Sequence, residues 1–332
     1  MTDNSSNSSI PASLLSAAVA ALQRGSLVAF PTETVYGLGA DASNAQALTA
    51  LYRVKGRPAA RPLTVHLADV EDIAQWAAYI PPAAQKLIDS YCPGPLTLIL
   101  PRRPEVLDIV TAGSENVGIR LPSHPIARQL IRAFGKGLAA PSANRSGYLS
   151  PTTAEHVRQE FGTDVPIIID GGPCQLGLES TIVDFSTTPP RLLRSGLLTL
   201  DMLQETAGLE IQTPALAPAA TSGSHYKPHT AVQSCPTSDL QACVERELAQ
   251  HHQPLAVLYY SPRAVFSNGP DLRLLQLPNQ PLEYAQRLYA SLRYLDGCSL
   301  RSIIIEDVPH TAEWSVLRQR IHQIAPVKHK LT

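Results

Sequence analysis

The sequence predicts an α/β protein with a mixed sheet. Stretches with apolar residues at helical spacing alternate with short strand-like runs up to about residue 206. In the run at residues 62–67, apolar side chains alternate with Thr64 and His66, which is the period of a strand with one polar face. Hydrophobic residues make up 44% of the 332 positions, which is enough for a sizeable core.

The expected helices and strands follow one another in short segments. Gly25 and Gly56 stand where helix C-terminal caps are expected, and Thr152 with Glu155 fits a capping box. Helices are predicted at residues 13–24, 43–54, 70–78, 83–91, 125–134 and 153–161. Strands are predicted at residues 27–30, 62–67, 96–100, 117–121, 137–140, 166–170, 180–185 and 191–194.

The composition changes between residues 206 and 239, where Pro, Ala, Ser, Thr and Gly prevail and no helical or strand period is evident. Such a length is unusual inside a compact domain and indicates a linker with a functional or disordered role. A second α/β unit follows, with strands at 255–260 and 302–305 and helices at 282–295 and 313–324. The predicted order is a disordered tail at 1–10, a main domain at 11–206, a linker or lid at 207–250 and a small domain at 251–332.

The bulk charge and the cysteines exclude several classes of protein. The formal net charge of -1 gives no global basic field for nucleic acid, so a polyanion site has to be a local cluster. The five cysteines form no CxxC pair, which argues against a disulfide framework or a zinc knuckle. No apolar run approaches the ~20 residues of a membrane span, and the N-terminus lacks a signal pattern. We expect a soluble cytoplasmic protein.

The segment at residues 53–66 holds four fixed cations and one histidine but no acid. The cations are Arg53, Lys55, Arg57 and Arg61, at a turn between a predicted helix and a predicted strand. Arginine offers planar paired donors to phosphate and lysine a compact charge, so the group suits a polyphosphate. A solvated basic turn is the plainer alternative, and the cluster alone does not distinguish ATP from RNA.

Three further segments have small polar side chains at turns. Residues 140–147 place hydroxyl, amide and main-chain N–H groups between a strand and a helix, as phosphate sites do. Residues 31–39 follow the first strand, and residues 178–181 precede another. The plainer alternatives are an ordinary loop at 140–147, a turn with an exposed Glu33 at 31–39 and a plain strand start at 178–181. No GxSxG, Walker A or HExxH motif is present.

Taken in order, these motifs resemble the YrdC-type threonylcarbamoyl-AMP synthases. The resemblance rests on FPTETVYGLG at 30–39, KGRP at 55–58, PLTVH at 62–66, APSANRSG at 140–147, SPT at 150–152 and LEST at 178–181. In addition, SGSHYKP at 222–228 is similar to the HYxP element of the long-form members, which carry a small C-terminal α/β domain. The resemblance covers nearly the whole chain after its first ten residues.

The resemblance implies a fold and an activity. The fold would be a twisted mixed sheet enclosing a basic cavity, followed by a small Rossmann-like α/β domain. The enzyme would be a nucleotidyltransferase that converts L-threonine, bicarbonate and ATP, with Mg²⁺, into threonylcarbamoyl-AMP and pyrophosphate for tRNA modification. Downstream tRNA threonylcarbamoyl-transfer proteins would take the product, while direct tRNA binding stays open. Neither a membrane partner nor a protein-bound metal is implied.

The same resemblance implies roles for individual residues. Lys55 and Arg57 would be the catalytic residues, because they would stabilise charge on the triphosphate. Tyr226, in the linker, would close over the nucleotide. The ATP site would comprise Lys55, Arg57, Arg61, Ser142, Asn144, Ser150, Arg194 and Tyr226. The threonine site would comprise Thr34, His66, Arg120, Ser180 and the backbone near Ala140.

Two other functions fit part of the sequence. A pure RNA-binding module would use the basic segment at 53–66 for a phosphate backbone, although the net charge of -1 counts against it. A carbamoyl-transfer enzyme of hydrogenase maturation would share a YrdC-like domain. That class also carries acylphosphatase and zinc-finger modules, and the chain has neither CxxC pairs nor the length for them.

Overall fold

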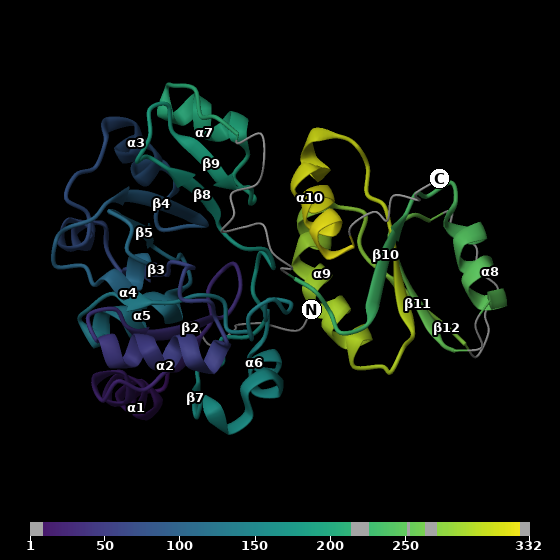
Figure 1. Cartoon of the computed structure of the whole chain (residues 1–332), viewed down its shortest axis with the longest axis horizontal. Helices are drawn as coiled ribbons and strands as arrows, with labels where there is room; N and C mark the ends of the chain where they lie inside the picture. The colour runs from purple at the N-terminus through teal and green to yellow at the C-terminus, as the bar shows by residue number, and fades with distance from the viewer. Residues whose placement is uncertain (1–8, 214–225, 251–252, 263–270, 326–332) are drawn as a thin grey trace. The chain divides into compact units, whose positions relative to one another are not determined.

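The computed structural model describes residues 9–213, 226–250, 253–262 and 271–325, in two compact units (Figure 1). The first unit comprises Met1–Ser146 and Ser150–Gly223. The second comprises Gly147–Leu149 and Ser224–Thr332. The second unit thus includes residues 224–250, which the sequence analysis assigns to a linker or lid.

The first unit contains most of the helices and a nine-stranded sheet. Its helices are α1 (Ala12–Gln23), α2 (Ala45–Lys55), α3 (Pro82–Tyr91), α4 (Asp108–Thr111), α5 (Pro125–Phe134), α6 (Ala154–Phe161) and α7 (Leu200–Ala207), with 3₁₀ turns η1 (Val70–Gln75) and η2 (Gly162–Asp164). Its strands are β1 (Val28–Phe30), β2 (Gly37–Asp41), β3 (Thr64–His66), β4 (Leu96–Pro101), β5 (Asn116–Arg120), β6 (Leu138–Ala139), β7 (Ile167–Ile168), β8 (Thr181–Asp184) and β9 (Arg191–Arg194).

The sheet of the first unit is mixed, as the sequence predicts. Its strand order is β7-β1-β2-β6-β3-β5-β4-β8-β9. The pairs β1–β7, β3–β5 and β4–β8 are parallel, and the remaining neighbours are antiparallel. This order places β3 and β5 at the centre, so the polar residues at their carboxyl ends, His66 and Arg120, are direct cross-strand partners.

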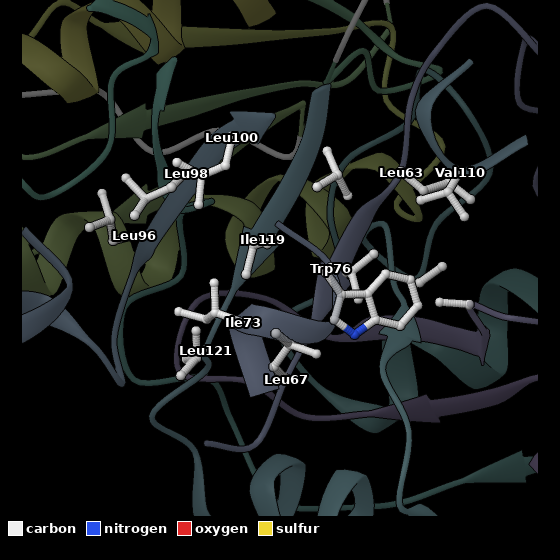
Figure 2. Packing of buried hydrophobic residues seen from close by; sticks show 14 of the residues in the cluster. Leu63, Leu67, Ile73, Trp76, Leu96, Leu98, Leu100, Val110, Ile119 and Leu121 are labelled. Carbon is white, nitrogen blue, oxygen red and sulfur yellow. The ribbon is translucent and has the colours of Figure 1, made fainter. Parts of the chain in front are cut away.

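Both faces of this sheet are buried, and alternate strand residues reach different core clusters. In β1, Val28 and Phe30 pack with α1 and α5, while Ala29 belongs to the larger cluster on the other face. The larger cluster contains Leu98 and Ile119 from the neighbouring strands β4 and β5, together with Leu63, which directly precedes β3 (Figure 2). A strand buried on both faces needs apolar residues at consecutive positions, which explains the unbroken apolar runs in the sequence.

Local signals explain where the helix that precedes the basic segment begins and ends. The Asn44 side chain accepts hydrogen bonds from the N–H groups of Gln46 and Ala47, which would otherwise be unsatisfied at the helix start. Helix α2 ends at Gly56, which adopts a left-handed conformation with φ +59° that glycine tolerates best. The helix therefore stops with Lys55 on its last turn, beside the loop that carries the remaining cations.

The second unit is a small α/β domain with a parallel sheet, in the order β10-β13-β11-β12. Its strands are β10 (Ala231–Cys235), β11 (Leu255–Tyr259), β12 (Leu272–Gln276) and β13 (Ser302–Glu306). Its helices are α8 (Leu240–Gln250), α9 (Pro281–Asp296) and α10 (Ser315–Ile324), with the 3₁₀ turn η3 (Ala312–Trp314). The prediction of a small α/β domain is confirmed.

Several local predictions are wrong. The expected helix at 70–78 is the 3₁₀ turn η1, and the N-cap of α6 is Thr153, whose side chain accepts from the His156 N–H, and not Thr152. The segment at 206–239 contains strand β10, so its described part is not free of regular structure. Ile10 is buried against α1 and α5, so the tail ends before it; residues 1–8 lie outside the described residues.

Candidate active site

The motifs of the first unit meet around the loop that follows β1. Main-chain hydrogen bonds bring together segments that lie 76 to 143 residues apart in the sequence, so the site is assembled by the fold. These bonds run from Leu38 N–H to the Pro141 carbonyl, from Ala143 to Tyr36, from Ala140 to Thr64, from Ser146 to Lys55 and from Gly177 to Thr34.

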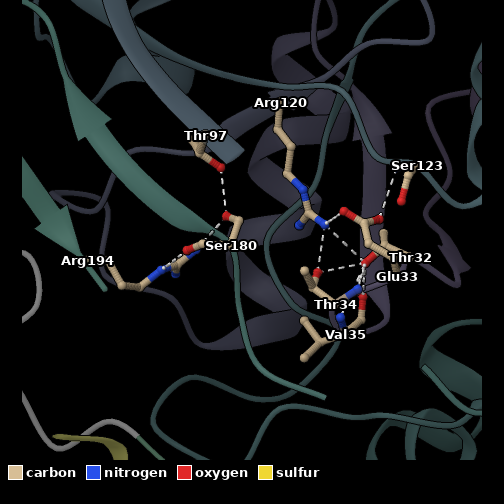
Figure 3. A network of polar contacts seen from close by, with 9 residues as sticks. All are labelled: Thr32, Glu33, Thr34, Val35, Thr97, Arg120, Ser123, Ser180 and Arg194. Atoms are coloured by element: carbon tan, nitrogen blue, oxygen red, sulfur yellow. Dashed lines mark hydrogen bonds and ion pairs between the residues drawn. The ribbon is translucent and has the colours of Figure 1, made fainter. Parts of the chain in front are cut away.

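Arg120, at the end of β5, is the centre of a buried polar network (Figure 3). Its Nη2 donates to Glu33 Oε1 over 2.8 Å and to Thr34 Oγ1 over 2.7 Å. The second Glu33 oxygen accepts from the Ser123 N–H over 3.1 Å. The Arg120 and Glu33 side chains are 6% and 3% exposed, so their ion pair is shielded from water.

A second polar chain runs beside the first through the neighbouring strand β4 (Figure 3). Thr97 is the cross-strand partner of Arg120, and its hydroxyl lies 2.7 Å from Ser180 Oγ. Arg194 Nε donates to the Ser180 carbonyl and its Nη2 to Ser180 Oγ, both over 2.9 Å. The predicted residues Thr34, Arg120, Ser180 and Arg194 therefore belong to one polar region of the sheet.

His66 is a buried neutral imidazole at the end of β3. Burial, with the nearby Arg120 cation, lowers the pKa of His66 to about 3. Its Nδ1 lies 3.3 Å from the Thr64 carbonyl, an acceptor, so Nδ1 carries the proton and Nε2 is left as an acceptor. An imidazole with this pKa gains a proton poorly at neutral pH, which favours a contact role for His66 over a role as general base.

The depressed pKa of His66 predicts a pH-dependent stability. Because the folded pKa of about 3 lies below the ordinary value of 6.5, the folded state disfavours the proton. The contribution of neutral His66 to the free energy of unfolding is complete above pH 6.5. It is lost as the pH falls towards 3, at about 1.4 kcal/mol per pH unit. Urea unfolding between pH 7 and 4 should show that the free energy of unfolding falls less steeply with pH in His66→Gln than in the wild type. The exposed His310→Gln variant should keep the wild-type slope, and equal slopes in all three proteins would contradict the prediction.

Two cations of the basic segment, Lys55 and Arg57, donate to main-chain oxygens. Lys55 Nζ donates to the carbonyls of Ser142 and Asn144. Arg57 donates through Nε to the Arg61 carbonyl and through Nη2 to the Pro62 carbonyl. Among the described residues, no ion pair joins Lys55, Arg57 or Arg61 to an acid. Their positive charge is therefore available to an anion.

Electrostatics of the basic segment support the same conclusion. Burial lowers the pKa of Arg57, and the neighbouring cations Arg61 and Arg194 lower it further. Burial first, and then Arg57, hold the pKa of Lys55 well below its usual range. A bound polyanion would relieve this repulsion between cations.

The hydroxyl and amide side chains of the segment at 140–150 are ordered by side-chain hydrogen bonds. Ser142 Oγ donates to Asn144 Oδ1 over 2.5 Å. Ser150 Oγ donates to Glu179 Oε1 over 2.6 Å, and both side chains are buried. The Ala140 N–H donates to the Thr64 carbonyl over 2.9 Å, so this N–H is not available to a ligand.

Tyr226 belongs to the second unit. It has a left-handed backbone with φ +62°, its ring stacks on Tyr289 at 5.7 Å, and the Arg320 guanidinium lies 4.2 Å from its centroid. Its expected neighbour in the lid, His225, lies outside the described residues. The proposed closure over a nucleotide stays a prediction.

Three residues that bond to predicted site residues were not themselves predicted. Glu33 is not an exposed turn residue, as its plainer interpretation held, but the partner of Arg120. Thr97 lies in no motif, and only its alternation within β4 marks it as polar among apolar neighbours. Glu179 lies within LEST, but nothing in that motif identifies Ser150 as its partner.

Neither a preformed metal cluster nor a membrane span is evident in the part of the chain that the structure describes. No group of three or more His, Cys, Asp or Glu side chains there could hold a metal ion. No described helix is long and apolar enough to cross a bilayer.

Two family models cover most of the chain. Residues 20–196 match the Sua5/YciO/YrdC model, described as "Telomere recombination". Residues 198–325 match the model described as "Threonylcarbamoyl-AMP synthase, C-terminal domain". The two matches adjoin, so one model accounts for the motif-bearing region and the other for the region after it.

Individual proteins are similar to the chain over nearly its full length. The threonylcarbamoyl-AMP synthase of Bacillus subtilis is 37% identical over 318 residues, which cover 93% of this chain and 92% of that protein. The one of Pyrococcus abyssi is 36% identical over 303 residues, 86% of each chain. The crystal structure of P. abyssi Sua5 complexed with L-threonine superposes with a TM-score of 0.85 at 33% identity, covering 93% of both chains. The chain therefore belongs to the Sua5/YciO/YrdC family, in the long form that carries the C-terminal domain of threonylcarbamoyl-AMP synthases.

Proposed function

We propose that the protein is an L-threonylcarbamoyl-AMP synthase that uses L-threonine, bicarbonate and ATP and releases pyrophosphate. The observation that carries the proposal is the full-length similarity to proteins of that name, one of them solved with L-threonine. The product is the donor for a tRNA modification, so downstream tRNA threonylcarbamoyl-transfer proteins would accept it in the cytoplasm.

For threonine, the buried network around Arg120 supplies the complementary chemistry. The guanidinium is a natural partner for the carboxylate of the amino acid, and Glu33 fixes its orientation from the opposite side. Thr34 and Ser180 offer hydroxyls, and His66 offers Nε2 as an acceptor for the ammonium or the hydroxyl. The main-chain carbonyl of Ala140 lies in the segment bonded to Thr64 and completes this set.

For ATP, the basic segment and the 140–150 segment supply positive charge and small donors. Arg57, Arg61 and Arg194 would face the phosphates, while Lys55 would hold the Ser142–Asn144 backbone and add charge beside it. Mg²⁺ would arrive with ATP, because it prefers phosphate oxygens and water to a protein cage. The buried carboxylates here are engaged, Glu33 with Arg120 and Glu179 with Ser150, which fits a metal brought by the substrate.

The reaction needs no covalent enzyme intermediate. The threonine amine bonds to the carbon of bicarbonate, a C–O bond of bicarbonate breaks, and the hydroxyl group leaves with the amine proton as water, which gives a carbamate. A carbamate oxygen then attacks the α-phosphorus of ATP, its bond to the β-phosphate oxygen breaks, and pyrophosphate leaves. The contribution of the protein is to position the two substrates and to stabilise the charge that develops on the leaving group.

A direct assay tests the proposal. The purified protein is incubated with ATP, Mg²⁺ and bicarbonate, and pyrophosphate is followed with L-threonine, with L-valine or with no amino acid. We expect release that depends on both threonine and bicarbonate, with valine much poorer because it leaves the polar groups around Ser180 without a hydroxyl. Pyrophosphate release at the same rate with and without threonine would contradict the proposal.

ATP binding is expected to take up a proton at Lys55. Its pKa is held well below the usual range in the free protein, and a bound triphosphate would raise it. Affinity should therefore fall as the pH rises through the free-protein pKa. Calorimetry in two buffers of different ionisation enthalpy measures the uptake, which Lys55→Met should abolish; equal uptake in the variant would show that another group titrates.

The same experiments separate the two alternative functions. An RNA-binding module would bind tRNA tightly without threonine-dependent turnover. A carbamoyl-transfer enzyme would consume carbamoyl phosphate in place of threonine and bicarbonate. Direct binding of tRNA by this chain is measured in parallel, at two salt concentrations, because phosphate-backbone binding weakens steeply with salt.

A further inference from the structure

The second unit includes a three-residue insert, Gly147–Leu149, from the region of the nucleotide motifs. In the chain the insert lies between Asn144 and Ser150, two of the residues assigned to ATP. Main-chain bonds hold both of its ends. Lys227 N–H donates to the Gly147 carbonyl over 2.9 Å, and Arg293 Nη2 donates to the Leu149 carbonyl.

The middle residue of the insert, Tyr148, is held by its side chain. Its hydroxyl donates to Asp296 Oδ2 over 2.6 Å. Its ring stacks on His229, with centroids 4.8 Å apart and planes 24° apart, and the Arg293 guanidinium lies 4.6 Å from its centroid. A hydroxyl bond to a carboxylate and a cation beside an aromatic ring are both stronger than neutral contacts.

Asp296, the last residue of α9, is itself fixed in place. Its carboxylate also accepts from the N–H groups of Thr230 over 2.6 Å and of His229 over 3.1 Å. Desolvation raises the pKa of Asp296, but the hydrogen bonds from Tyr148 and from these two amides lower it overall. The carboxylate is therefore a charged and rigid acceptor for the Tyr148 hydroxyl.

We propose that the C-terminal unit is a positioning element for the nucleotide segment, acting through the Tyr148–Asp296 bond and through Arg293. The inference rests on the proposed function, because it assigns a task in ATP binding. Covalent continuity carries the effect: fixing residues 147–149 limits the backbone freedom of residues 144–150. Phosphate recognition by a loop benefits from such preorganisation, since a loop that is ordered before binding loses less conformational entropy and so binds more tightly. Tyr148, Asp296 and Arg293 are positioning residues and not catalytic ones.

Steady-state kinetics with Tyr148→Phe and Asp296→Ala test this role. Each variant should raise the KM for ATP roughly five- to tenfold, with kcat changed less than about twofold and the KM for threonine unchanged. The double variant should be no worse than Asp296→Ala, because Asp296→Ala already removes the bond that Tyr148→Phe removes. Tyr294→Phe is the matched control, since Tyr294 is an exposed tyrosine on the same helix and should behave as wild type.

Hydrogen exchange gives a readout that does not depend on turnover. In both variants the amides at 144–150 should exchange faster, including Ser146 N–H, which donates to the Lys55 carbonyl over 2.7 Å. The amides of β4 and β5 should stay protected. If Tyr148→Phe alone raises the KM for ATP, or if the two effects add, Tyr148 acts on the nucleotide directly and the inference is overturned. If wild type shows no threonine-dependent turnover, the proposed function fails, while exchange still decides on positioning.

Discussion

Arg120→Met is expected to remove threonine binding and to lower the free energy of unfolding by about 3–5 kcal/mol. Arg120 and Glu33 form an ion pair whose side chains are almost completely buried. Removing one partner leaves the other charge buried without compensation, which is far costlier than losing a surface pair. The loss of a charged partner for the carboxylate should weaken threonine binding by roughly 10²-fold or more.

Urea unfolding and calorimetric titration with threonine measure the two effects of Arg120→Met separately. Glu33→Gln combined with Arg120→Met should recover part of the stability but none of the threonine affinity, because it removes the orphaned charge and not the binding defect. Arg128→Met is the control: Arg128 pairs with Asp69 where both side chains are about a third exposed, so the cost should stay under about 1 kcal/mol. Threonine affinity that survives in Arg120→Met would refute the assignment.

Lys55→Met is expected to reduce pyrophosphate release by roughly 10²-fold or more, the loss seen when a preorganised donor is removed. Its ammonium joins the end of α2 to the carbonyls of Ser142 and Asn144. Without it both the charge and the shape of the 140–147 segment change. The two carbonyls also lose their donor, at a cost of about 1–3 kcal/mol in stability, which removal of a buried ammonium partly offsets.

Lys86→Met provides the comparison for Lys55→Met. Lys86 also donates to a main-chain carbonyl, that of Ala207 at 3.4 Å, but it is exposed and lies on α3, outside the motifs. Turnover should be unchanged and stability altered by less than about 0.5 kcal/mol. Near-normal release by Lys55→Met, measured with saturating ATP and threonine, would exclude Lys55 from catalysis.

Elements with strong periodicity could be predicted from the sequence, and elements made by tertiary contacts could not. Helix α5 and strand β9 have the predicted bounds, because Pro125 and Gly135 mark the ends of the helix and Arg191 and Arg194 those of the strand. Strand β2 went unnoticed because Gly37 and Gly39 weaken any strand signal. A Cβ atom at Gly39 would lie 2.9 Å from the Phe30 ring, so the packing between β1 and β2 favours glycine at this position.

The candidate site could be predicted as a set of residues but not as a set of contacts. The motif resemblance named Arg120 and Thr34, which the fold brings to 2.7 Å. It did not name Glu33 as the partner of Arg120, since the two lie 87 positions apart, and only the fold brings the loop after β1 to the end of β5. Nor could it show that Lys55 faces carbonyl oxygens, because that depends on the path of the 140–147 segment.

The two outermost strands of the nine-stranded sheet have a consequence for the behaviour of the protein in solution. Strand β7 has only two residues, and β9 carries Arg191 and Arg194 at its ends. A short edge and a charged edge both resist the addition of a strand from another molecule. This sheet is thus protected at each border against growth into aggregates, although apolar residues make up most of its buried interior.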